Sequence, residues 1–138
     1  MSNEINTSLA IITEDVNAGG NYFSGTVETF DEKKRLANAM SNPDFRLSDF
    51  INKTINVVDV FIEKAQVTSQ NTGELVDIPR VVLIDDKGKS YSSLSFGVFN
   101  SLKKIISVFG FPTWEDGIPI EVQRIQKGDR QIYNLIIK

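Results

Sequence analysis

Residues 96–110 read FGVFNSLKKIISVFG, and this stretch decides how the second half of the chain is organised. Its apolar side chains recur with the spacing of one helix face: Phe99, Leu102, Ile106 and Phe109. This periodicity predicts a helix over Phe96–Phe109. Ser95 is a candidate N-cap, and Gly110 is a typical stop signal. A helix with such a wide apolar face is expected to cover one end of a larger structure.

Strand patterns lie on both sides of this helix. Three precede it, at Thr54–Val67, Ile78–Asp85 and Ser90–Ser95, and two follow it, at Ile118–Gln126 and Gln131–Ile137. The resulting order, β-β-β-α-β-β, is the order of the five-stranded OB barrel. The strand face and connecting loops of that barrel commonly bind single strands of nucleic acid. The expected fold class is therefore mainly β with α, an OB-fold barrel.

The N-terminal part is expected to form an arm, a strand and a short helix before the barrel. Residues 1–21 are polar and acidic and end in a Gly-Gly break, so we expect a flexible arm followed by one domain over residues 22–138. Tyr22–Phe30 has a strand pattern, and Asp31–Met40 a helix pattern that Asp31 could cap. The arm carries isolated apolar residues that suit self-association: Ile5, Leu9, Ile11 and Ile12.

Composition excludes several classes of site. The chain of 138 residues has no Cys and no His, which removes thiolate metal sites and Ser-His or Cys-His triads. No run of 18 apolar residues is present, so no membrane span is expected. Glu4 and the lack of a basic start make the N-terminus a poor signal peptide. We expect a cytoplasmic protein without cofactor, metal or small-molecule substrate.

Charge is distributed unevenly along the chain. The net charge is −3, yet residues 1–32 hold six acidic and no basic residues. All 15 basic residues lie in residues 33–138, together with the other 12 acidic ones. The predicted barrel is therefore mildly basic and the arm acidic, which is compatible with a nucleic-acid partner.

Aromatic residues on polar strand faces are candidates for stacking on bases. Phe61 lies between two acidic positions of its strand and either stacks or packs under the N-terminal helix. Tyr91 has a serine on each side, which favours an exposed ring. Tyr133 is as compatible with the core as with stacking. Trp114 is expected to close the bottom of the barrel.

Basic residues near the predicted hairpins are candidates for phosphate contacts. The nucleic-acid-binding set predicted from sequence is Phe61, Lys64, Arg80, Lys87, Lys89, Tyr91, Lys127, Arg130 and Tyr133. Lys87 and Lys89 flank one predicted turn, and Lys127 and Arg130 flank the last one. Each of these basic residues, considered alone, is most simply explained as an ordinary surface charge. Two basic hairpins together with polar-flanked aromatics indicate single-strand binding.

Several stretches together resemble a known family. They are Ser41–Leu47, Pro79–Asp85, Lys89–Tyr91, Phe99–Ile105 and Pro112–Trp114. In order and spacing they resemble the small single-stranded-DNA-binding proteins of phages and conjugative plasmids of Gram-positive bacteria. The resemblance implies an OB fold and non-catalytic, cooperative coating of single-stranded DNA with little sequence preference. An alternative function is an OB-like protein-interaction adaptor in a replication or virion assembly.

Overall fold

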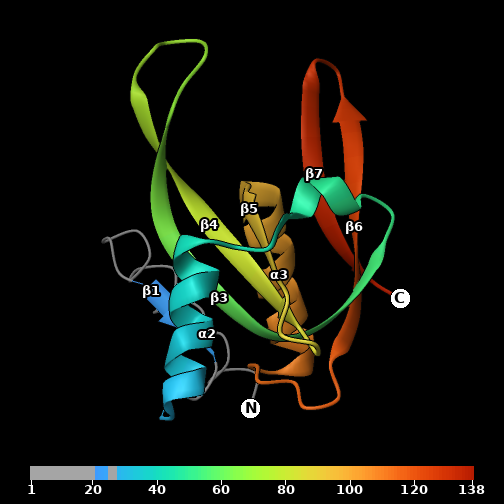
Figure 1. The fold of residues 1–138 in the computed structure, drawn as a ribbon. Coiled ribbons are helices and arrows are strands. Elements are labelled where there is room, and N and C mark those ends of the chain that lie inside the picture. Colours follow the sequence, from blue (N-terminus) through green and yellow to red (C-terminus); the bar gives the residue numbers. More distant parts are fainter. Residues whose placement is uncertain (1–20, 25–27) are drawn as a thin grey trace.

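The computed structural model describes residues 21–24 and 28–138 (Figure 1). The predicted arm, with Ile5, Leu9, Ile11 and Ile12, lies outside the described residues except for Asn21. The described elements are β1 (Asn21–Phe23), α2 (Phe30–Ser41), β2 (Phe45–Arg46), the 3-10 helix η1 (Leu47–Phe50), β3 (Thr54–Thr68), β4 (Leu75–Asp85), β5 (Ser90–Leu94), α3 (Phe96–Phe109), β6 (Ile118–Lys127) and β7 (Arg130–Ile137).

The predicted order of three strands, one helix and two strands is confirmed by β3-β4-β5-α3-β6-β7. These strands form one mixed sheet in the order β2-β5-β4-β3-β6-β7, and β1 pairs with β3. The sheet curls into a half-barrel. Its two sides are connected by residues 45–52, because β2 runs parallel to β5 while Ile51 bridges to Val122 of β6. The amide of Asn52 also donates to the Val122 carbonyl at 2.8 Å.

Two hairpins extend beyond the body of this sheet. The β3–β4 pairing continues to Thr68 and Leu75, although β1 and β5 pair with these strands only as far as Glu63 and Arg80. The β6–β7 pairing continues to Lys127 and its partner Arg130 in the same way. Figure 1 shows the two hairpin ends rising on either side of β5.

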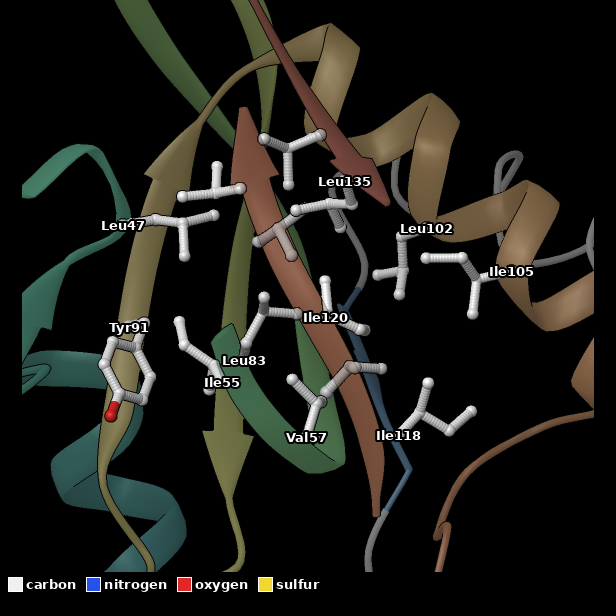
Figure 2. Packing of buried hydrophobic residues seen from close by; sticks show 14 of the residues in the cluster. Leu47, Ile55, Val57, Leu83, Tyr91, Leu102, Ile105, Ile118, Ile120 and Leu135 are labelled. Atoms are coloured by element: carbon white, nitrogen blue, oxygen red, sulfur yellow. The ribbon is translucent and has the colours of Figure 1, made fainter. Parts of the chain in front are cut away.

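The main core lies between the curled sheet and α3 (Figure 2). Val57, Val60 and Ile62 of β3 all contribute to it. An alternating strand would place Val57 on the opposite face from Val60 and Ile62, but a β-bulge between Val57 and Asp59 shifts the phase of the side chains. Trp114, predicted to close the bottom of the barrel, is 8% exposed and belongs to this core.

Helix α3 begins and ends where the sequence predicts. The Ser95 hydroxyl accepts from the Val98 amide at 3.2 Å, and Gly110 at φ 88° ends the helix. Gly97 lets the first turn approach β7 closely, since a Cβ there would overlap the carbonyl oxygen of Tyr133. A glycine is therefore required where α3 meets β7.

Two N-terminal predictions were wrong. Thr29, rather than Asp31, caps α2: its hydroxyl accepts from the Glu32 amide, and the Glu32 carboxylate accepts from the Thr29 amide. These hydrogen bonds lower the pKa of Glu32. The predicted strand Tyr22–Phe30 is described only as the three residues of β1, and Phe30 already belongs to α2.

Candidate nucleic-acid interface

A groove of about 380 Å³ lies among β4, β5, residues 46–48 and the β6–β7 pair. Ser92–Leu94 of β5 and Arg46–Ser48 of the β2–η1 segment line it, together with Arg80 of β4, Val122 of β6 and Tyr133 of β7. These residues lie far apart in sequence and meet because residues 45–52 cross from β5 to β6. The groove thus combines hydroxyl groups, two guanidinium groups and one phenol ring.

Of the two arginines that line the groove, one has an acidic partner and the other has none in the described structure. Arg80 donates to the Glu63 carboxylate at 3.1 Å, and its side chain is 16% exposed. Arg46 is exposed, and among the described residues no carboxylate lies within 4 Å of it. Glu63 therefore compensates Arg80 and fixes its position, whereas Arg46 gives the groove an uncompensated positive charge.

Tyr91 is not the exposed stacking residue that the sequence predicted. It is 7% exposed, because β2 pairs in parallel with β5 and places Phe45 opposite it. The ring stacks on Phe45 at 5.3 Å and meets Phe50 edge-on at 5.0 Å. Its hydroxyl donates to Asp85 at 2.8 Å. Burial and this hydrogen bond raise the pKa of Tyr91 to about 12. Figure 2 shows the hydroxyl pointing away from the apolar core.

The exposed aromatic at this place is Phe45, which the sequence predictions missed. Phe45 remains 39% exposed and rests on the buried Tyr91 and the half-buried Phe50. The sequence offers little signal for this ring, because the two-residue strand β2 is too short to show a pattern of alternation. A supported ring with one open side is suited to stacking.

The other two predicted aromatics have different environments. Phe61 is 1% exposed and packs with Ala39, Val82 and Ile84 beneath α2, so the core alternative applies and stacking by Phe61 is excluded in this conformation. Tyr133 is half-buried, packs against the main core and lines the groove. Tyr133 is therefore the one predicted aromatic that the structure places at the groove.

Apart from Arg80, the predicted cations lie in three places outside the groove. Lys64 pairs with Asp77 at 3.6 Å on the β3–β4 hairpin. Lys87 and Lys89 lie in the β4–β5 turn, where the Asp85 carboxylate accepts from both of their amides at 2.9 and 2.8 Å. Lys127 and Arg130 form the end of the β6–β7 hairpin. All four turn residues are exposed, and none has a carboxylate within 4 Å among the described residues.

A family model described as "Phage Single-stranded DNA-binding protein", of the phi29 type, matches residues 18–138. The chain belongs to this family. The match confirms the predicted resemblance to phage single-stranded-DNA-binding proteins and spans every residue of the groove. Searches of curated proteins and of solved structures gave no match.

The described part of this phage single-stranded-DNA-binding protein contains no metal-ligating cluster and no membrane-spanning helix. Within residues 21–24 and 28–138, no three acidic, histidine or cysteine side chains gather into a group that could hold a metal ion. In the part of the chain that the structure describes, no helix has the length and apolarity needed to cross a membrane.

Proposed function

We propose that the groove among β4, β5, residues 46–48 and the β6–β7 pair binds single-stranded DNA. The proposal rests on one observation: Arg46, without an acidic partner in the described structure, and the half-buried Tyr133 face a common groove in a member of a single-stranded-DNA-binding family. A phosphate would pair with Arg46, and an unpaired base would stack on Tyr133. Bases in a duplex already stack on each other, so a duplex offers no free face to this ring.

Little sequence preference is expected from this lining. Positive charge and aromatic faces recognise features that every nucleotide shares. The serines Ser92 and Ser93 offer hydroxyl groups that accept or donate, so they do not select one base edge. The described groove is therefore suited to binding single strands of any sequence rather than one defined sequence.

We infer that the half-barrel is an OB-type barrel. The element order and the apolar helix α3 between the third and fourth barrel strands support this assignment. In that fold, the loop between the first two barrel strands and the loop between the last two border the ligand. Those loops correspond here to the ends of the β3–β4 and β6–β7 hairpins.

The proposed biological role is non-catalytic protection of single strands during phage replication or DNA transfer, in the host cytoplasm. We further propose that the acidic arm, residues 1–21, links neighbouring subunits through its apolar residues and so makes coating cooperative. A subunit tethered to its neighbour binds the next stretch of DNA at a raised effective concentration.

Fluorescence anisotropy with matched single- and double-stranded oligonucleotides tests the function. Single strands should bind and duplexes should not. Arg46→Gln should lower the slope of log K against log salt by about 0.7, the value for one phosphate contact on a single strand. Lys104→Gln, the matched control on the exposed side of α3, should leave the slope unchanged. Equal affinity for both DNA forms would contradict stacking, and no binding would favour the adaptor function.

A further inference from the structure

A second polar pocket, of about 200 Å³, lies between α2 and the β4–β5 turn. Arg35, Asn38 and Asn42 line it from the α2 side, and Lys87–Ser90 line it from the turn. We propose that this pocket binds a backbone phosphate of the same DNA strand that occupies the groove, which extends the binding path across β2. This inference rests on the proposed function and adds a subsite to it.

The pocket carries an excess of positive charge. Arg35, Lys87 and Lys89 line it, whereas Asp44 is its one acidic lining residue among those described. The Asp44 carboxylate is already engaged, since it accepts from the amide and the hydroxyl of Ser90 at 3.0 and 3.2 Å. Within the described residues, none of the three cations has a carboxylate within 4 Å. The lining therefore holds three cations against one carboxylate, and this excess of positive charge favours an oxyanion.

The fold positions the backbone that carries the two lysines and brings Arg35 against it. The side chain of Arg35 lies over Gly88: a Cβ on Gly88 would be 3.6 Å from the Arg35 Nε. Asp85 fixes the turn by accepting from the amides of Lys87 and Lys89. Arg35 therefore meets the turn at the glycine between the two lysines, where its guanidinium group is available for bidentate contact with phosphate.

Pocket and groove lie on the same two neighbouring segments. Along β5, Ser90 lines the pocket and Ser92 lines the groove, which is two residues or about 7 Å of strand. Along the chain leading into β2, Asp44 lines the pocket and Arg46 lines the groove. Phe45 lies between Asp44 and Arg46 in sequence, but it pairs with Tyr91, so strand alternation places its ring on the opposite face of β2. A strand leaving the groove along β2 and β5 would thus reach the basic pocket within two residues.

A ladder of labelled oligo-dT, from about 4 to about 30 nucleotides, tests this path. The pocket variant is Arg35→Gln with Lys87→Gln. The matched control is Lys33→Gln with Lys34→Gln, which removes the same charge from exposed positions of α2 outside the pocket. On long oligomers the pocket variant should lower the salt slope by about 0.7 for each phosphate that the protein no longer binds. On the shortest oligomer that binds, it should match the parent.

Phe45→Leu tests separately whether the exposed ring of Phe45 stacks on a base. Leucine keeps an apolar cover on Tyr91 but removes the stacking face, so stacking there would show as a loss of about fivefold or more in affinity for long oligomers. The salt slope that the pocket contributes should not change. Thermal melting of every variant checks that the fold is retained. Equal effects of the pocket and control variants at every length would overturn the phosphate subsite while leaving groove binding intact. A parent protein that binds no oligomer would overturn the proposed function as well.

Discussion

Replacing Tyr91 separates a structural role from a DNA-binding role. The Tyr91 ring is 7% exposed and contacts both Phe45 and Phe50, and its hydroxyl donates to Asp85. We predict that Tyr91→Ala acts on stability: it removes a buried aromatic ring and leaves a cavity, at a cost of about 3–5 kcal/mol. That cost is a large part of the roughly 5–15 kcal/mol that stabilises an ordinary domain.

Tyr91→Phe should be much milder. It keeps the ring and both aromatic contacts, and it removes one hydrogen bond to a carboxylate, worth about 1.5–3 kcal/mol. We expect a loss of stability near the lower end of this range, because the other Asp85 oxygen still accepts from the amides of Lys87 and Lys89. Asp85 is therefore left with partners after the substitution.

Urea unfolding followed by circular dichroism measures both variants, and anisotropy with oligo-dT measures their binding well below the unfolding midpoint. The midpoints should fall in the order parent, Tyr91→Phe, Tyr91→Ala, with an unchanged slope. Binding by the folded fraction of Tyr91→Phe should match the parent. A Tyr91→Ala protein that keeps the parent midpoint and loses DNA affinity would refute the burial argument and restore Tyr91 as a stacking residue.

Other features of the molecule lead to four more expected outcomes. Because the pKa of Tyr91 is raised from 10.0 to about 12, the stability that its neutral form contributes is complete below about pH 10 and is lost as the pH rises through 12. Urea midpoints of the parent should therefore fall more steeply over that range than those of Tyr91→Phe, and parallel curves would contradict this. Gly97→Ala should destabilise the fold by about 1–3 kcal/mol or more in thermal melts, since its Cβ would overlap a β7 carbonyl oxygen; an unchanged melting temperature would show that α3 and β7 are less closely packed. Replacing Lys127 and Arg130 with Gln should lower the salt slope of oligo-dT binding by up to about 0.7 for each phosphate that these side chains neutralise, and an unchanged slope would place the DNA away from this hairpin. Deleting residues 1–20 should remove cooperativity on long oligo-dT with near-normal affinity for short oligomers; tighter binding at every length would instead identify the acidic arm as a cover of the basic groove.

Local sequence patterns predicted the order of elements and most of their limits. The helix α3, its Ser95 cap and its Gly110 end depend on neighbours within a few residues, so the sequence carries them directly. The same holds for the strands, whose composition and turn signals are local. The Thr29 cap is also a local feature, and the signal that was missed is the Thr-x-x-Glu spacing of a capping box.

Whether an individual aromatic ring is buried or exposed depends on contacts with residues that are distant in sequence. Two serine neighbours favoured an exposed Tyr91, but β2 covers it from a segment far earlier in the chain. Phe61 is buried because α2 packs over it, an alternative that the strand pattern left open. The bulge near Val58 changed the phase of β3, and nothing in the alternation of apolar residues marked its place.

In the proposed function, residues 42–52 contribute to both stability and DNA binding. They join β5 to β6, cover Tyr91 through Phe45, and line both the groove and the basic pocket. Arg46 is exposed and has no acidic partner in the described structure, so substitutions there should alter binding alone. Leu47 is buried, so substitutions there should alter folding first. The proposed function is compatible with a net charge of −3. On this proposal, affinity depends on where cations without acidic partners lie around the groove, and the total charge is a poor measure of that placement.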